Sequence, residues 1–377
     1  MFMFCALLAI ILIFLFLFPY TVYPWSLSWF REKPVHIDPN APLPSATFVF
    51  SAYNEARALP GKIENLRAIK AMHPDIEIIA YSDCSADNTL DILKANDDII
   101  HVMSGTERAG KATGMRHMVA KAKGEVVVFT DANVILDPQS ITPLLRYFTD
   151  PSIGGVAGTL KYINEDASST AKVGGLYWRL EEMIKRLESR SGSIMGADGS
   201  IFATRRSLYP VVPAHLLDDM VTSMSVTFHG KRLIHATDVI AYEKNATSSS
   251  DEFRRKRRIA CRAFNTHRHL WSSICQHYNG RDIYKYVAHK YIRWLGLPVL
   301  GLSLAFLMTA LVLAGQYAWA GFVAALTIVA IVLGMMDIPL FRSGYQIFLS
   351  IVATFYGVMD SLQGKTYQTW APAASRD

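Results

Sequence analysis

The sequence lacks the motifs that mark several large classes of protein. Its four cysteines, Cys5, Cys84, Cys261 and Cys275, have no paired spacing. They predict neither a zinc site nor a disulfide framework, and they fit a reducing compartment. The sequence has no glycine-rich dinucleotide fingerprint, no P-loop and no serine or cysteine nucleophile motif. No internal repeat is visible. These absences disfavour dinucleotide-binding enzymes, P-loop nucleotidases, nucleophilic hydrolases and repeat proteins.

Hydrophobic residues make up 51% of the chain, and the excess over a soluble enzyme lies at the two ends. Residues 2–18 are almost unbroken Phe, Leu, Ile, Met and Ala. No basic residue precedes this run and no small-residue cleavage site follows it. Residues 1–20 are therefore predicted to be a retained transmembrane anchor rather than a signal peptide. Residues 21–45, which become proline-rich, are predicted to be a linker.

The second apolar region, residues 291–363, is predicted to form two or three C-terminal transmembrane helices. Segments 294–314 and 318–336 are long enough to span a bilayer. A weaker segment, 345–363, contains Asp360. It is expected either to span within a bundle or to lie partly in the interface, with its acid packed inward.

The net charge of +6 is dominated by the run Arg254-Arg255-Lys256-Arg257-Arg258. This run lies in residues 251–290, which are predicted to form basic amphipathic helices at the membrane. Nucleic-acid binding would suit it, but a stripe facing membrane lipids beside the next span is simpler, so no nucleic-acid partner is expected. Basic residues follow the anchor, which places the main domain in the cytosol. We expect an integral protein of a bacterial inner (plasma) membrane, with residues 364–377 as its tail.

Residues 46–250 alternate between strand and helix patterns. Strands are expected at about 47–51, 77–81, 99–103 and 126–130, with helices between them at about 59–72, 87–95 and 110–123. This order predicts an α/β fold, with a doubly wound sheet and right-handed crossovers. In such sheets, ligands bind at the carboxyl ends of the strands.

Polar and acidic residues recur at strand ends or helix starts. The four clusters are Asn54/Glu55, Asp83 with Asp87, Asp131 with Asn133, and Asp218/Asp219. Acids at several strand ends, together with a basic cluster, suit a nucleotide-diphosphate substrate, because acids can bind base, ribose and metal while cations bind phosphate oxygens. A structural alternative stays open for Asp83, Asp87 and Asp218, each of which could cap a helix.

Together and in this order, these segments resemble family 2 glycosyltransferases, inverting enzymes that include cellulose, chitin and hyaluronan synthases and many exopolysaccharide transferases. The resemblance covers about residues 46–275, and the flanking apolar helices are similar to those of the membrane-bound members. It implies a GT-A fold, a doubly wound mixed sheet, between an N-terminal transmembrane helix and a C-terminal transmembrane cluster. It also implies a nucleotide-sugar donor, UDP-linked here, and a lipid-linked or polysaccharide acceptor at the cytosolic membrane face.

The resemblance assigns donor binding to a set of polar and charged residues: Ser51, Tyr53, Asn54, Glu55, Asp83, Lys111, Asp131, Arg257 and Arg258. Asp83 is similar to the acid that recognises the pyrimidine. Lys111 lies in a segment that resembles the family's Gly-Lys nucleotide contact. Asp198, in a glycine-flanked turn, is a candidate for the acceptor side.

The resemblance also assigns metal binding and catalysis. Asp131 and Asn133 stand where the family has an Asp-any-Asp motif, which implies Mg²⁺ or Mn²⁺ as cofactor. Asn133 replaces the second acid, and a neutral amide oxygen binds such an ion more weakly. Asp218 and Asp219 stand at the family's catalytic acid pair, in which the second acid is the general base.

Two alternatives to single sugar transfer stay open. One is a processive polysaccharide synthase that extrudes its product. Ile259 follows Arg258 where the synthases carry tryptophan, which favours single additions. The other is a catalytically inactive, membrane-anchored protein that binds sugar nucleotides, for which Asn133 is the sole support.

Overall fold

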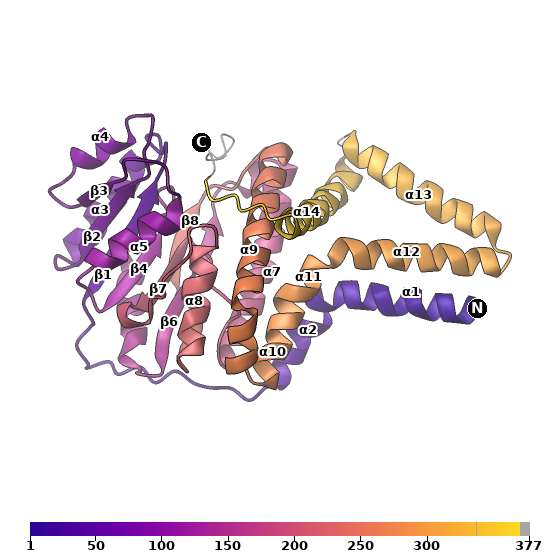
Figure 1. Ribbon diagram of the computed structural model, residues 1–377, viewed down its shortest axis with the longest axis horizontal. Coiled ribbons are helices and arrows are strands. Elements are labelled where there is room, and N and C mark those ends of the chain that lie inside the picture. Colours follow the sequence, from indigo (N-terminus) through magenta and orange to yellow (C-terminus); the bar gives the residue numbers. More distant parts are fainter. Residues whose placement is uncertain (337, 370–377) are drawn as a thin grey trace.

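The computed structural model describes residues 1–336 and 338–369, and it shows an α/β domain from which apolar helices project (Figure 1). The strands are β1 Ala46–Ala52, β2 Glu77–Ser82, β3 His101–Ser104, β4 Val126–Thr130, β5 Ile135–Leu136, β6 Ile153–Tyr162, β7 Ile201–Arg205 and β8 Arg232–Glu243. They form one sheet in the order β3-β2-β1-β4-β7-β6-β8-β5.

Helices cover both faces of this sheet. Those of the α/β domain are α3 Leu59–Met72, α4 Thr89–Lys94, α5 Lys111–Lys121, α6 Ile141–Arg146, α7 Ser169–Arg190, α8 Asp218–Phe228 and α9 Ser249–His277. The remaining helices are α1 Phe2–Leu17, α2 Val22–Ser26, α10 Gly280–Tyr286, a π-helical turn Val287–Tyr291, α11 Ile292–Trp294, α12 Gly296–Leu313, α13 Tyr317–Met335 and α14 Pro339–Leu362.

The sheet is mixed, as the sequence resemblance implied. β1 pairs in parallel with both β2 and β4, and β2 pairs in parallel with β3. β7 is antiparallel to β4 and to β6. The strands β1, β2 and β4 therefore end at one edge, and this edge receives the loops that carry the predicted site residues.

The strand sequences are apolar without a break because both faces of the sheet are covered. In β4, Val126 and Val128 face one apolar core, whereas Val127 and Phe129 face the other. All five residues of β4 are buried. A parallel strand that is buried on both faces has no solvent side on which to place polar residues.

Two local differences from the sequence prediction have clear causes. The helix expected from residue 110 begins at Lys111, because Gly110 adopts a φ of +87° that a helix cannot contain. The segment expected to be a linker begins with α2, whose Tyr23 is fully buried and packs with Ile184 of α7. Its proline content predicted a linker, but Tyr23 docks the start of the segment on the domain.

Four helices in the described ranges are long and apolar enough to cross a membrane: α1, α12, α13 and α14. α1 and α12 run side by side (Figure 1), and the Ser303 hydroxyl donates to the carbonyl of Ala9 at 2.9 Å. α14 differs from the other three because one of its faces is polar. In Figure 1 it runs towards the viewer, across the direction of α1 and α12.

The polar face of α14 packs along α9, the basic helix of the α/β domain. Gln346 donates to Ser249, Lys256 donates to Ser350, and Ser361 donates to Asn265, at 2.8, 2.7 and 2.7 Å. Gly357 makes the close approach possible, since a Cβ there would lie 2.3 Å from a backbone oxygen of α9. The helix predicted as the weakest span is therefore the one that anchors the α/β domain to the apolar helices.

Candidate active site

Four charged residues from separate parts of the chain meet at the carboxyl edge of the sheet, and we call them the catalytic cluster: Lys111, Asp131, Asp218 and Asp219. Lys111 opens α5, Asp131 directly follows β4, and the two neighbouring acids form the first turn of α8. The ammonium nitrogen of Lys111 lies 2.6 Å from an oxygen of Asp131 and 3.8 Å from an oxygen of Asp218.

Gly199 completes the catalytic cluster from the loop before β7. A Cβ at this position would lie 2.8 Å from Nζ of Lys111, 3.4 Å from Oδ2 of Asp219 and 3.8 Å from Oδ2 of Asp131. Any side chain here would displace the lysine or fill the space beside the acids. Apart from being a glycine that follows Asp198, Gly199 carries no local sequence signal for this role.

Asp219, the second acid of α8, has a raised proton affinity. Burial, followed by the neighbouring charge of Asp218, raises the pKa of Asp219 to about 7. The backbone N–H of Met220 donates to Asp219 at 2.6 Å and opposes this shift in part. A carboxylate with a pKa near neutrality is suited to accept a proton from a substrate hydroxyl.

Lys111 stays protonated within the cluster. Burial alone would lower its pKa, but Asp131, Asp218 and Asp219 outweigh burial and hold the pKa of Lys111 above its ordinary value. Lys111 therefore neutralises part of the negative charge. The cluster still has three carboxylates against one lysine.

Two arginines of α9 extend the positive side of the site. Burial, together with Arg262 and Arg255, lowers the pKa of Arg258 to about 9, while Asp131 and Asp219 act in the opposite direction. Arg258 is thus within electrostatic reach of the cluster. Arg262, one helical turn further on, is buried and donates to the carbonyl of Leu216, just before α8. Sequence reasoning missed Arg262, although its spacing of four from Arg258 places both on one helix face.

Asp83 lies at the end of β2 and holds the loop that leads to Lys111. Its two carboxylate oxygens accept the backbone N–H groups of Ala109 and Gly110, both at 2.9 Å. Arg108, in the same loop, stacks on the ring of Tyr53 with 3.5 Å between guanidinium carbon and ring centroid. Asp83, which was predicted to recognise the base, therefore orients the loop that leads to Lys111 in this structure.

The first predicted donor loop is tied to the loop after β2. Asn54, with a φ of +52°, accepts the N–H of Ala86 at 2.8 Å, and the N–H of Glu55 donates to Thr89 at 2.9 Å. Asp87 accepts the N–H of Thr89 at 3.0 Å, which agrees with the structural alternative for this residue. Ser51 lies at the end of β1, where its Oγ would lie 3.3 Å from a Cβ added to Gly114 of α5.

The C-terminal segment after α14 contacts the loop that precedes Lys111. The side-chain amide of Gln368 donates to the carbonyl of Ala109 at 3.0 Å. Its backbone oxygen would lie only 2.6 Å from a Cβ at Gly110. The sequence predicted no such contact. Residues 370–377 of the predicted tail lie outside the described residues.

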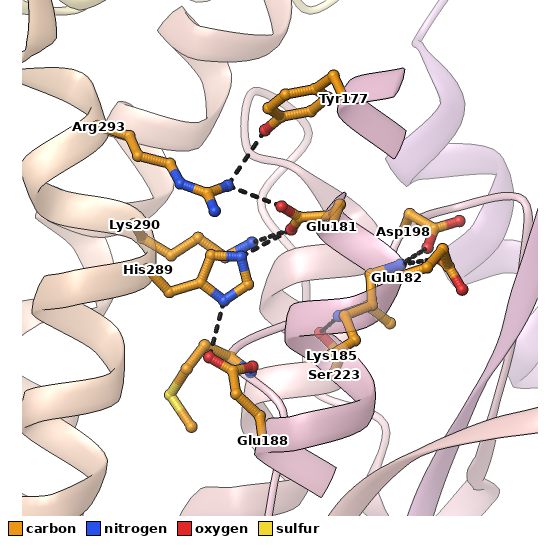
Figure 2. A network of polar contacts seen from close by, with 12 residues as sticks. Tyr177, Glu181, Glu182, Lys185, Glu188, Asp198, Ser223, His289, Lys290 and Arg293 are labelled. Atoms are coloured by element: carbon orange, nitrogen blue, oxygen red, sulfur yellow. Dashed lines mark hydrogen bonds and ion pairs between the residues drawn. The ribbon is translucent and has the colours of Figure 1, made fainter. Parts of the chain in front are cut away.

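Three predicted site residues have partners outside the catalytic cluster. Arg257 binds Asp360 of α14 at 2.5 and 2.9 Å, since successive residues of a helix lie about 100° apart around its axis. Asp198 accepts Lys185 of α7 at 2.8 Å (Figure 2). The Asn133 amide donates to Glu243, at the end of β8, at 3.0 Å. Each partner is distant in sequence and was not predicted.

The acids present fit a divalent ion that is shared with a substrate. In residues 1–336 and 338–369, no group of three or more His, Cys, Asp or Glu side chains is placed to hold a metal by itself. Mg²⁺ is commonly held by one or two carboxylates together with substrate phosphates. Asp131, with one oxygen on Lys111 and part of its side chain accessible, can supply such a carboxylate.

The geometry defines the class of protein, a GT-A-type fold with an acid cluster at its nucleotide edge, and comparisons with known proteins identify the family. A mannosyltransferase from Pyrobaculum calidifontis, solved with GDP-Man and Mn²⁺, superposes with a TM-score of 0.72 over 96% of this chain and 99% of that one. The sequences are 20% identical, so this likeness establishes the fold. Residues 47–211 match the family described as Glycosyl transferase family 2. The chain contains a family 2 glycosyltransferase domain.

Two bacterial relatives share part of this domain. A poly-β-1,6-N-acetyl-D-glucosamine synthase of Staphylococcus epidermidis is 27% identical over 166 residues, which are 43% of this chain and 39% of the synthase. An N-acetylglucosaminyltransferase of Azorhizobium caulinodans is 25% identical over 114 residues, 30% of this chain and 29% of that protein. The chain thus spans less than half of the length of either relative.

Proposed function

We propose that the protein is an inverting glycosyltransferase that moves a sugar from a nucleotide-sugar donor to a lipid-linked or polysaccharide acceptor at the cytosolic face of a membrane. The observation that carries this proposal is Asp219, a partly buried carboxylate with a raised pKa beside Lys111 and Asp131. The family 2 domain and the apolar helices support it.

The donor's diphosphate is proposed to lie between Lys111, Asp131 and Arg258. Lys111 and Arg258 supply positive charge to phosphate oxygens. Asp131 would hold Mg²⁺ or Mn²⁺ with the diphosphate, and the bound ion would stabilise negative charge on the leaving group. The loop that Asp83 orients carries the nucleotide end. Asn133 is proposed as a second oxygen ligand once its amide leaves Glu243 or turns over.

Asp219 is proposed as the general base. In a single displacement with inversion, an acceptor hydroxyl attacks the anomeric carbon while the nucleotide leaves from the other side. Asp219 removes the hydroxyl proton as the new bond forms. Asp218 keeps the pKa of Asp219 high enough to accept that proton near neutral pH. Arg262 holds the start of α8 through Leu216 and so positions both acids.

The donor is proposed to be UDP-linked and to carry an N-acetylhexosamine or a hexose. Both bacterial relatives are named for N-acetylglucosamine, which supports an N-acetylhexosamine. The flanking apolar helices support an acceptor held at the membrane. Exopolysaccharide or related glycan biosynthesis is the setting that these features favour.

The test is a screen of nucleotide sugars with membranes that contain the full chain, with Mg²⁺ or Mn²⁺ added. We expect one donor to be consumed and its sugar to appear in the lipid extract by mass. Membranes with Asp219→Asn serve as the matched background. Failure of every donor with either ion would reject the enzymatic proposal and favour an inactive sugar-nucleotide binding protein.

A processive synthase is the second candidate, and the name of the Staphylococcus epidermidis relative supports it. Product length separates the two. A single mass increment on the lipid supports one addition per acceptor, whereas a ladder of masses supports polymerisation. The isoleucine at position 259 leads us to expect the single increment.

A further inference from the structure

Tyr177 of α7 lies between two cations where the α/β domain meets the apolar helices (Figure 2 labels Tyr177 and Arg293). The ammonium nitrogen of Lys256, on α9, is 5.5 Å from the Tyr177 ring centroid. The guanidinium carbon of Arg293, just before α12, is 5.9 Å from the same centroid, and its Nη1 donates to the Tyr177 hydroxyl at 3.2 Å. The tyrosine is still 40% exposed.

Elements that border the membrane surround these three residues. Lys256 donates to Ser350 of α14 at 2.7 Å. Arg293 lies 5.1 Å from the ring of Tyr20, which follows α1. α1, α12 and α14 are all candidate spans. Arg293 therefore lies near the ends of α1 and α12, where spanning helices meet the aqueous phase, and Lys256 reaches the polar face of α14 at the middle of that helix.

The acids around these cations are shared among several partners. Glu181 accepts Arg293 at 2.7 Å, but it also accepts His289 at 2.7 Å and Lys290 at 3.4 Å. Glu252 is shared between Lys256 at 3.6 Å and Arg255 at 3.2 Å. Neither Lys256 nor Arg293 has a carboxylate of its own, so the junction has room for an additional negative charge.

Arg293 also has hydrogen-bonding capacity that the protein does not use. Its side chain is only 10% exposed, and its Nε and Nη2 have no hydrogen-bond partner among the described residues. Buried guanidinium N–H groups are normally satisfied. A phosphate presents several acceptor oxygens and suits the forked geometry of arginine. These donors therefore indicate an anionic ligand.

Two helices, α7 and α9, connect the junction to the catalytic cluster. α9 carries Lys256 and, less than one turn later, Arg258. α7 carries Tyr177 and, two turns later, Lys185, which binds Asp198 next to Gly199. Because Arg258 is within electrostatic reach of Asp219, a ligand at Lys256 lies on the same helix that borders the catalytic cluster.

We propose that Lys256, Arg293 and Tyr177 form a subsite for the phosphate of a lipid-linked acceptor. This inference rests on the proposed function, which it deepens by naming where the acceptor lipid is held. The lysine and the arginine bind the phosphate oxygens, the lipid tail passes between the apolar helices, and the sugar end extends towards Asp219. The same chemistry would also attract an ordinary phospholipid head group, and the test separates the two.

The test uses the full chain in phosphatidylcholine nanodiscs with a short polyprenyl phosphate as probe and without donor. Binding is measured as the rise in thermal midpoint with probe concentration. Lys256→Gln and Arg293→Lys should each weaken binding by about tenfold or more, since each removes charge-assisted hydrogen bonds. Arg254→Gln is the matched control: it removes one charge from the same basic run, and its side chain is 75% exposed. It should bind the probe as the wild type does.

Two results would overturn the subsite. One is that Lys256→Gln binds the probe as tightly as the wild type does, and the other is that Arg254→Gln loses as much affinity for the probe as Lys256→Gln. A second arm replaces the polyprenyl phosphate by phosphatidylglycerol at equal mole fraction. Equal saturable binding of that lipid would show a general head-group site and reject an acceptor site. If Arg293→Lys has a lowered thermal midpoint without probe, the variant is destabilised, and the test of the subsite then rests on probe binding by Lys256→Gln.

The proposed function is judged separately. Transfer by the wild type in the donor screen tests it, whereas probe binding needs no donor. Specific binding without transfer would reject the enzymatic proposal and keep the subsite. If the wild type transfers sugar but Lys256→Gln and Arg254→Gln bind the probe equally well, the subsite is rejected and the enzymatic proposal is kept.

Discussion

The catalytic cluster and the junction beneath it both bury charged side chains, yet their carboxylates are in opposite states. At the junction, burial would raise the pKa of Glu181, but His289, Lys290 and Arg293 outweigh burial and hold the pKa well below its usual value. In the catalytic cluster, burial and a second acid outweigh Lys111 and raise the pKa of Asp219. Figure 2 shows how closely the cations surround Glu181.

The difference comes from the sign of the neighbours and not from the depth of burial. His289 is fully buried, and its ring nitrogens lie 2.7 Å from Glu181 and 2.8 Å from Glu188. Lys290 and Arg293 add positive charge at Glu181, at 3.4 and 2.7 Å. Cations thus fix the acids of the junction as a rigid support. The acids of the catalytic cluster repel each other, and this leaves one of them able to exchange a proton.

The largest expected effect is on catalysis. Asp219→Asn should lower kcat for sugar transfer by about 10²–10⁴-fold, because a positioned general base is typically worth that much. The donor's binding should change little, since the amide keeps the size of the side chain. Turnover and nucleotide binding to membranes with the variant are the measurements. Full turnover would show that Asp219 is not the base.

The matching change at the junction should affect stability. Glu188→Gln leaves His289 with one carboxylate in place of two, and breaking a buried pair typically costs about 3–5 kcal/mol. We expect a clear fall in the thermal midpoint of the purified chain. Asp219→Asn, which removes a buried repulsion, should leave the midpoint unchanged or raise it. Equal falls in both variants would remove the contrast between the two sites.

The pH dependence of transfer should report the raised pKa. Asp219 must be ionised to accept a proton, so kcat/KM should fall as the pH drops below about 7, by about tenfold per unit. Above that value a plateau is expected until other groups titrate. If kcat/KM falls only below about pH 4, Asp219 titrates as an ordinary carboxylic acid in the enzyme without substrate.

The smallest expected effect concerns the metal. Asn133→Asp adds a carboxylate beside Asp131, and hard divalent ions prefer charged oxygen ligands. The Mn²⁺ or Mg²⁺ concentration for half-maximal transfer should fall by a few-fold. Asp238→Asn, remote from the cluster and bound to Tyr147, provides the control. An unchanged metal requirement in Asn133→Asp would place the ion elsewhere.

Local sequence patterns predicted much of the fold. The unbroken run of β4 and its polar end were enough to place a buried strand with Asp131 at the ligand-binding edge. The prediction of a doubly wound sheet was confirmed in the half built from β1 to β4, where β1, β2 and β3 are each followed by a helix. Strand β5 was not predicted, because it has only two residues and gains its identity from pairing with β8.

The site was predictable only in part, and the reason is long-range packing. Lys111, Asp131, Asp218 and Asp219 each followed a local signal and do meet. Asp198 and Arg257 carried similar local signals but are bound by Lys185 and Asp360. The direction in which a side chain leaves its helix depends on its position in the helical turn. In α9, Arg257 faces Asp360 of α14, whereas the next residue, Arg258, is within electrostatic reach of Asp131 and Asp219.

The sequence by itself determined the alternation of strand and helix, the apolar ends and the residue types at the sheet edge, because each depends on neighbours within a few positions. Only the tertiary structure decided which charges pair. The pKa of Asp219 is raised because α8 places it beside Asp218 at a partly buried position, and the pKa of Glu181 is lowered because three cations from one distant segment converge on it. Electrostatic effects depend on distance in space, and folding sets that distance independently of separation along the chain.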